Sequence, residues 1–168
     1  SSFPIKGTRA ASSNKEHNKA VMRELKKSDK DRAEHVMIVD LIRNDLGKIC
    51  EYGSVKTNNL FNVVSYETIN HMVTEINGKI KSNVNETDIF RALFPGGSIT
   101  GAPKQRAVEI IDKIESYSRG IYTGSIGIIT NNGNMIFNIA IRTLTLKNGS
   151  GIYPVGGGIV WDSNANDE

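Results

Sequence analysis

Two short turn signals near the end of the chain restrict its fold more than any other feature. Asn132-Gly133 and Asn148-Gly149 each separate segments rich in strand-forming residues. An Asn-Gly pair is a strong β-hairpin signal, because both residues tolerate the positive φ angles that a tight turn needs. We therefore expect strands at 124–130, 135–147 and 153–161. Antiparallel strands with helices on one face define the α+β class, which is the fold class that we predict.

Helical and strand patterns also alternate through the first two thirds of the chain. Ser13 or Asn14 can cap a helix built from strong helix formers, and a second helix begins at Asp29 with its apolar residues on one stripe. We expect helices at 14–27, 29–49, 85–94 and 104–115, two strands within 54–80 of which the second covers 71–80, and a strand end followed by a flexible polar loop at 1–13.

The composition limits the possible partners and compartments. The 168 residues include 21 basic and 18 acidic side chains, and no arginine-rich patch stands out, so a nucleic-acid partner is not expected. No apolar run approaches the roughly 20 residues of a membrane span. Cys50 is the only cysteine, which excludes an intrachain disulfide and favours a reducing, cytoplasmic location.

Five segments resemble one enzyme family. The resemblance runs from Pro4 to Glu168 and is to the chorismate-utilising enzymes, which include anthranilate, aminodeoxychorismate, isochorismate and salicylate synthases. It implies that residues 1–168 are the C-terminal part of a chorismate-binding β-sandwich with helices packed on the outside, and that the N-terminal part is absent. The segments are PIKGT (4–8), EHVMIVDLIRNDLG (34–47), FPGGSITGAPK (94–104), RGIYTGSIG (119–127) and IAIRTLTLKNGSGIYPVGGGIV (139–160).

Lys6 in PIKGT distinguishes between the branches of this family. Anthranilate and isochorismate synthases usually carry alanine here, whereas aminodeoxychorismate synthases carry lysine. A lysine amine is a nucleophile once an apolar or cationic setting removes its proton. The resemblance implies that Lys6 attacks chorismate C2 while the C4 hydroxyl leaves, and that ammonia then adds at C4 and expels the lysine.

The resemblance also implies a magnesium site. Glu34 matches the magnesium-binding glutamate of the family, and Glu168 matches the first acid of a C-terminal E-x-x-E pair whose second acid is absent. Asp31 and Glu34 stand three positions apart, so on a helix both could face the same hard cation. Magnesium would neutralise the ring carboxylate of chorismate.

Several further residues are predicted to contact the substrate. Glycines near a helix start let backbone N–H groups approach an anion, which makes Thr100 and Gly101 candidates. Three consecutive glycines weaken a strand, so a ligand or another backbone is expected to come close to Gly156, Gly157 and Gly158.

Three side chains complete the predicted site. Arg142 lies in the apolar run IAIRTLT, where strand alternation places it on the face of Ala140 and Leu144, and a guanidinium can hold a carboxylate of chorismate by two hydrogen bonds. By resemblance, Tyr122 matches a tyrosine that touches the enolpyruvyl carboxylate, and His71 matches a histidine near the reacting ring. No role is assigned to His35 beyond support of its helix.

The expected activity is therefore amination of chorismate to 4-amino-4-deoxychorismate, with ammonia from a glutamine amidotransferase partner. The first alternative is anthranilate synthase component I, and the second is a non-catalytic module that binds nucleic acid or another anion. Because the resemblance also implies a missing acid–base glutamate and missing strands, we expect the 168 residues alone to lack activity and to self-associate.

Overall fold

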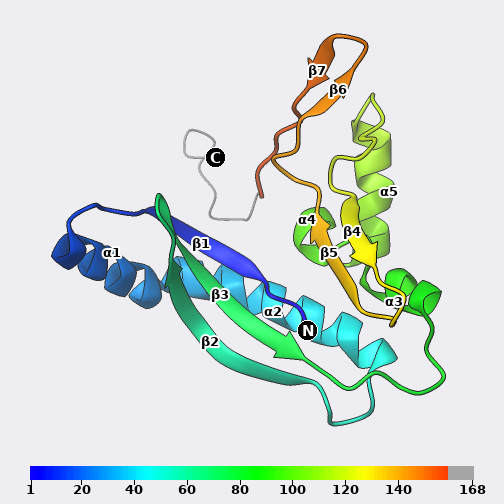
Figure 1. The fold of residues 1–168 in the computed structure, drawn as a ribbon, viewed down its shortest axis with the longest axis horizontal. Coiled ribbons are helices and arrows are strands. Elements are labelled where there is room, and N and C mark those ends of the chain that lie inside the picture. Colours follow the sequence, from blue (N-terminus) through cyan, green and yellow to red (C-terminus); the bar gives the residue numbers. More distant parts are fainter. Residues whose placement is uncertain (159–168) are drawn as a thin grey trace. The chain divides into compact units, whose positions relative to one another are not determined.

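The computed structural model describes residues 1–158, which form two compact units, the first covering Ser1–Ser98 and the second beginning at Ile99 (Figure 1). Each unit mixes helices with antiparallel strands, which confirms the α+β class. Among residues 1–158, no helix has the length and apolar character needed to cross a bilayer.

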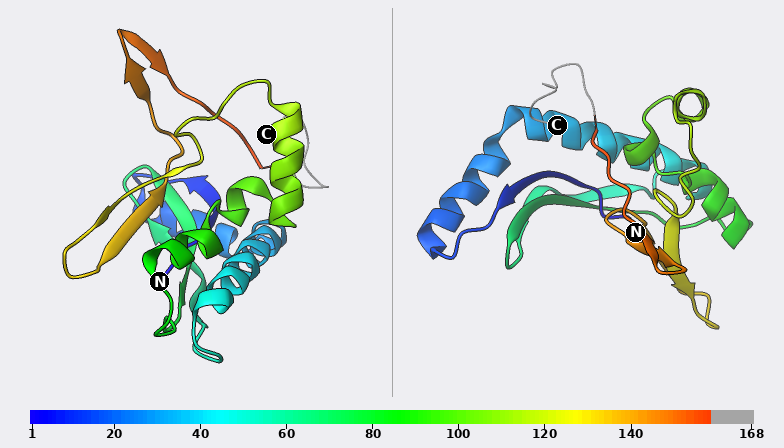
Figure 2. Two further views of the ribbon diagram at one scale, coloured as in Figure 1. Left: turned by 90° about the vertical axis from the view of Figure 1, so that its right-hand side faces the viewer. Right: turned by 90° about the horizontal axis from the view of Figure 1, so that it is seen from above.

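The first unit is built on a three-stranded antiparallel sheet in the order β1-β3-β2. Helices α1 and α2 lie along one face of this sheet, which the views in Figures 1 and 2 both show. The elements are β1 (Ile5–Ala10), α1 (Lys15–Lys27), α2 (Asp29–Ile49), β2 (Lys56–Ser65), β3 (Ile69–Asn77) and α3 (Glu86–Leu93), followed by the short α4 (Gly97–Thr100).

The central strand, β3, explains how sheet and helices pack. Its side chains alternate without exception between buried and partly exposed, because successive residues of a strand point to opposite faces. Met72 and Ile76 are fully buried on the helix side, and burial of each such side chain contributes about 1.5–3 kcal/mol. Asn70 and Thr74 occupy the same face and are also buried. The core thus contains polar side chains that need hydrogen-bond partners.

The helices of this unit begin where their capping residues predict. The Asn14 side chain accepts hydrogen bonds from the backbone N–H groups of Glu16 and His17, and Ser28 caps α2 through the N–H of Asp31. Asn85 forms a complete capping box with Asp88 at the start of α3. These contacts satisfy backbone donors that lack a partner within the helix, and they confirm the predicted helices.

Strand β1 is longer than the sequence predicted. We expected a flexible loop over most of residues 1–13, whereas the strand continues to Ala10 through pairing with β3. The register shifts between Ile5 and Thr8, and Gly7 in that irregular stretch has a φ of 83°. A bulge of this kind re-aims the neighbouring side chains, and the side chain that precedes it is Lys6.

The second unit contains helix α5 (Lys104–Ile114) and two hairpins. Strand β4 (Ser125–Ile129) pairs with β5 (Met135–Ile139), and β6 (Thr145–Lys147) pairs with β7 (Ser150–Ile152). Both predicted hairpin turns are confirmed. Asn148 and Gly149 have φ angles of 51° and 78°, as a tight two-residue turn requires.

Two strand predictions in this unit were wrong. The single strand expected over 135–147 is interrupted after Ile139: Ala140 exchanges backbone hydrogen bonds with Thr123 and Gly124, and the N–H of Ile141 then bonds back to Ile139. Arg142 follows with a φ of 52°, a value outside the strand region. The strand expected at 153–161 is absent from its described part, 153–158; residues 159–161 lie outside the described residues.

Candidate active site

Lys6 and Glu34, both predicted from the sequence, meet in the first unit. Lys6 lies on β1 and Glu34 on α2, and the Lys6 Nζ is 3.6 Å from Glu34 Oε2. About a quarter of each side chain is exposed, 28% for Lys6 and 21% for Glu34. The pair is therefore accessible to a small molecule while being partly shielded from water. The Lys6 amine thus lies beside a carboxylate, whereas the sequence argument expected apolar or cationic surroundings that would remove its proton.

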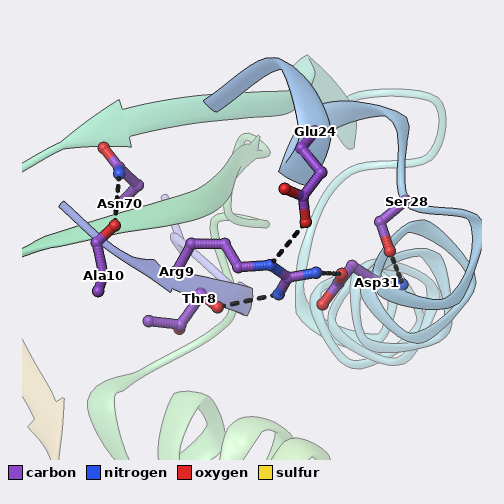
Figure 3. A network of polar contacts seen from close by, with 7 residues as sticks. All are labelled: Thr8, Arg9, Ala10, Glu24, Ser28, Asp31 and Asn70. Carbon is purple, nitrogen blue, oxygen red and sulfur yellow. Dashed lines mark hydrogen bonds and ion pairs between the residues drawn. The ribbon is translucent and has the colours of Figure 1, made fainter. Parts of the chain in front are cut away.

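Arg9 anchors the same strand to both helices, as Figure 3 shows. Its guanidinium donates to Asp31 Oδ2 at 2.9 Å, to Glu24 Oε1 at 3.4 Å and to the carbonyl oxygen of Thr8 at 3.0 Å. Burial lowers the pKa of Arg9, but the hydrogen bonds and charges of Asp31 and Glu24 outweigh burial and raise the pKa overall. Asp31 is therefore held by Arg9, which removes the reason for pairing it with Glu34 on one cation.

His35, directly after Glu34, is buried between α2 and the sheet. Its Nε2 lies 2.6 Å from the hydroxyl of Thr74 on β3, and its ring stacks at a tilt on Phe61 with the ring centroids 6.0 Å apart. Burial lowers the pKa of the imidazole, and the nearby backbone of Lys6 opposes that shift. The ring nitrogen Nδ1 is buried and has no hydrogen-bond partner among residues 1–158.

His71 lies on β3 directly opposite Thr8 of β1. Its Nδ1 is 2.9 Å from the Thr8 hydroxyl, and its ring packs edge-on against Tyr66 with the centroids 5.8 Å apart. The histidine is thus tied to the PIKGT segment through Thr8, two residues beyond Lys6. It alternates with the buried positions of β3, so it projects from the face that α1 and α2 do not cover.

The glycine-rich segment at 94–104 forms a short connection and not an uninterrupted helix start. Thr100 ends α4, and Gly101 follows with a φ of 101°. Pro103 then precedes the first turn of α5, where no side chain caps the helix. A backbone angle of this kind is open to glycine and strained for most other residues. The backbone conformation at position 101 therefore favours glycine. A role of Gly101 in substrate binding remains a prediction.

Tyr122 and Gly156 come close together. A Cβ atom placed on Gly156 would lie 2.6 Å from the Tyr122 hydroxyl, so a larger residue here would require the phenol to shift. Arg119 packs over the tyrosine ring at 5.7 Å and holds Glu115 through two hydrogen bonds. The hydrogen bond from Arg119 lowers the pKa of Glu115. The close approach expected at the glycine run is therefore made by a side chain of the same unit.

Arg142 does not occupy the strand position that we predicted. It lies exposed between β5 and β6, and the proposed common face fails because Ala140 is fully buried whereas Leu144 is 54% exposed. Gly157 and Gly158 are exposed and outside any strand. The substrate contacts of these residues remain predictions.

Of the two magnesium ligands implied by the resemblance, Glu34 lies within the described residues and Glu168 lies outside them. A carboxylate oxygen suits a hard cation, and the Glu34 side chain is partly exposed. Residues 1–158 contain no group of three or more His, Cys, Asp or Glu side chains arranged to hold a metal. Glu34 therefore fits one position of such a site, and further ligands would have to come from residues 159–168, a longer protein or the substrate.

Comparison with known proteins shows the family of this chain. Residues 1–168 match the family described as chorismate binding enzyme. The chain therefore belongs to the chorismate-binding enzymes, which confirms the resemblance seen in the sequence.

Named relatives cover most of this chain and come from two branches. The chain is 48% identical over 98% of its length to the chloroplastic aminodeoxychorismate synthase of Arabidopsis thaliana, of which it covers 18%. It is 45% identical over 95% of its length to aminodeoxychorismate synthase component 1 of Bacillus subtilis, covering 34% of that protein. It is also 43% identical over 99% of its length to anthranilate synthase component 1 of Saccharolobus solfataricus, covering 39%. The chain thus spans well under half of each of these relatives.

Solved structures support the same fold. Anthranilate synthase component I of Streptococcus pneumoniae superimposes with a TM-score of 0.81 at 34% identity, covering 99% of this chain and 41% of that one. A Bacillus anthracis chain assigned as a 2,3-dihydroxybenzoate-specific isochorismate synthase gives a TM-score of 0.84 at 29% identity, covering 99% and 44%. The fold is therefore shared by members of the family that are named for different reactions.

The sequence reasoning missed His35 and Thr74. The sequence patterns predict no role for His35 beyond support of its helix, and they do not single out Thr74. Both are almost completely shielded from solvent, with exposures of 0% and 1%. One signal was available: Thr74 stands at the same alternation as Met72 and Ile76 within β3, and a hydroxyl on the buried face of a strand needs a partner.

Proposed function

We propose that the full-length protein carrying this chain aminates chorismate to 4-amino-4-deoxychorismate. The observation that carries the proposal is the meeting of Lys6 and Glu34, at 3.6 Å, from two different elements. Membership of the chorismate-binding family supports the substrate, and relatives named aminodeoxychorismate synthase support the reaction. The lysine in PIKGT favours this branch over the anthranilate-forming one.

Lys6 is the proposed nucleophile. Its amine forms a bond to chorismate C2, the two conjugated ring double bonds shift toward C4, and the C4 hydroxyl leaves as water with a proton that the amine gives up. Ammonia then forms a bond to C4, both double bonds shift back, and the bond from C2 to the Lys6 nitrogen breaks as a proton passes from the new ammonium group to the departing amine. Each step forms one bond and breaks another, and the free lysine is regenerated. Ammonia is expected from a glutamine amidotransferase partner.

Glu34 is proposed to hold magnesium, which would neutralise the ring carboxylate of chorismate when bound. A cation bound to the Glu34 carboxylate would replace Lys6 as the partner of Glu34 and leave the lysine amine free to react. His71 is proposed to act near the ring, linked to the Lys6 strand through Thr8 at 2.9 Å. Tyr122, Arg142, Thr100, Gly101 and the glycines at 156–158 are proposed to contact the carboxylates of the substrate.

The test is covalent trapping of Lys6 in the full-length protein. Incubation with chorismate and magnesium without ammonia should add the mass of a chorismate-derived group to the Lys6 peptide, and Lys6→Ala should abolish this adduct and slow amination at C4. Lys56→Ala on β2 is the matched control and should leave both unchanged. An unmodified Lys6 peptide under turnover conditions, together with unaltered amination by Lys6→Ala, would remove lysine from the mechanism.

Anthranilate synthesis is the second candidate. It is favoured by one observation, the 43% identity to a relative named anthranilate synthase component 1. The two reactions differ in their products, because only anthranilate synthesis releases pyruvate. Chromatography of the products from chorismate, magnesium and ammonium separates them, and anthranilate with stoichiometric pyruvate would replace our proposal with this one.

A further inference from the structure

Thr74 of β3 joins three elements of the first unit at one buried point. Its backbone N–H donates to the carbonyl oxygen of Pro4 at 3.3 Å, and its hydroxyl oxygen accepts the backbone N–H of Phe61 at 3.3 Å. The same oxygen lies 2.6 Å from Nε2 of His35. Thr74 therefore contacts the start of the PIKGT segment, strand β2 and helix α2 together.

The contact with Phe61 compensates for an irregular stretch of β2. The pairing register between β2 and β3 shifts between Asn58 and Asn62, and Phe61 in this stretch has a φ of 60°. Such a backbone angle is rare for an aromatic residue and persists only where the surroundings hold it. The Thr74 hydroxyl provides the hydrogen bond that the ladder loses here. Thr74 is therefore held by β2 through Phe61 and by the segment before β1 through Pro4.

His35 connects Thr74 to helix α2 and so fixes the helix relative to β3. The imidazole is completely buried, lies against Phe61 with centroids 6.0 Å apart, and bonds the Thr74 hydroxyl. In an α-helix, 3.6 residues make one turn, so successive side chains are about 100° apart around the axis. Fixing His35 therefore determines the direction of Glu34, the residue just before it. Glu34 points toward Lys6, two residues beyond Pro4.

We infer that His35 and Thr74 are positioning residues that set Glu34 against Lys6. Thr74 holds the strand segment that carries Lys6 through Pro4, and it holds the helix that carries Glu34 through His35. The inference rests on the proposed function only in giving Lys6 and Glu34 a chemical role. The positioning itself is a property of the metal-free, substrate-free protein and can be measured without turnover.

The experiment measures the reactivity of Lys6 in the full-length protein. A neutral acetylating reagent is applied at fixed pH, and the acetylation rate of Lys6 relative to the exposed Lys56 is followed by mass spectrometry. Thr74→Val keeps the side-chain volume and loses the hydroxyl, so Lys6 should lose its partner part of the time and react faster, by about twofold or more, as expected for residues in contact. Thr74→Ser restores the hydroxyl and should return the wild-type rate.

A double-mutant cycle shows whether Thr74 acts through Glu34. Glu34→Gln should raise Lys6 acetylation by itself, and adding Thr74→Val to Glu34→Gln should raise it no further, because the contact to be positioned is already gone. Thr57→Val on β2 is the matched control for loss of a threonine hydroxyl and should not change Lys6. If Thr74→Val prevents folding, His35→Leu breaks the same contact from the helix side and leaves no unpaired ring nitrogen.

Turnover gives a second readout. Misplacement of catalytic groups by about 1 Å can reduce rates about a hundredfold, so Thr74→Val should lower kcat/KM for chorismate between about tenfold and a hundredfold. An unchanged Lys6 rate in folded Thr74→Val and His35→Leu, or effects of Thr74→Val and Glu34→Gln that add, would overturn the inference. A confirmed cycle in a protein that makes no aminodeoxychorismate would keep the positioning and reject the proposed function.

Discussion

Replacement of Gly7 by alanine tests how the bulge in β1 presents the reactive lysine. Gly7 follows Lys6, and its φ of 83° lies in the region that side chains disfavour. A Cβ atom added there would lie 3.1 Å from Asp31 Oδ1 and 3.1 Å from Leu25 Cδ1. These neighbours are poorly able to move, because Leu25 is fully buried and Asp31 is held by Arg9.

Two costs combine in this variant. A left-handed backbone conformation at a non-glycine residue lowers the free energy of unfolding by about 1–2 kcal/mol. An extra methyl group in a packed region costs about 1–3 kcal/mol when its neighbours must shift. We therefore expect Gly7→Ala to destabilise the protein by about 2–5 kcal/mol. The value within this range depends mainly on how far the Asp31 side chain can move away from the added methyl group. Because Asp31 is bound to Arg9, any shift also disturbs the strand that carries Lys6.

Gly53→Ala separates the two costs. Gly53 has a similar φ of 74°, but nothing lies within 4 Å of an added Cβ atom. The Gly53→Ala variant should be destabilised only by the backbone cost, about 1–2 kcal/mol. Urea denaturation of the full-length variants, followed by far-ultraviolet circular dichroism, gives both values, and chorismate turnover is measured on the same samples. Gly7→Ala should be the less stable variant and the less active one.

One result would refute the reasoning. If Gly7→Ala were no less stable than Gly53→Ala and kept wild-type turnover, then Asp31 and Leu25 would not constrain the bulge. The bulge would then have no part in presenting Lys6.

Three further predictions concern other parts of the chain. Glu34→Gln should weaken magnesium-dependent chorismate binding by about tenfold or more, because an amide is a poorer ligand for a hard cation; calorimetry with and without magnesium tests this, with the exposed Glu16→Gln as control. Burial raises the pKa of the Cys50 thiol, so alkylation by iodoacetamide at pH 8 should be slow in the native protein and fast in urea, and equal rates would contradict the buried position. The 168-residue polypeptide alone should associate, because strand residues such as Ile128 and Ile136 are 68% and 79% exposed; sedimentation as a monomer would exclude this.

Local features of the fold were predictable because they depend on neighbouring residues. Asn14 and Asn85 cap their helices through backbone groups two or three residues away, and Asn148-Gly149 adopts the turn that its φ preferences favour. The PIKGT and EHVMIVDLIRNDLG segments indicated the family in the same way, since each is a continuous run of sequence. These signals were sufficient for the α+β class and for the choice of Lys6 and Glu34.

The remaining features depend on contacts between residues distant in the sequence. Arg142 follows a strand-like pattern, but the strand ends at Ile139, where the N–H of Ile141 bonds back to Ile139 and Arg142 adopts a φ of 52°. Asp31 is equally suited by spacing to a shared cation, yet Arg9 of another element binds it.

The sequence by itself determined which residues can react, because side-chain chemistry and local motifs are written along the chain. Only the tertiary structure decided which of them meet: Glu34 faces Lys6 at 3.6 Å, and the helix that carries it is held by a buried bond between His35 and Thr74. These two residues are 39 positions apart, and no periodicity within either segment specifies the partner in the other. Their pairing follows from the packing of a helix on a sheet, where a buried polar group must find its hydrogen bond across the interface.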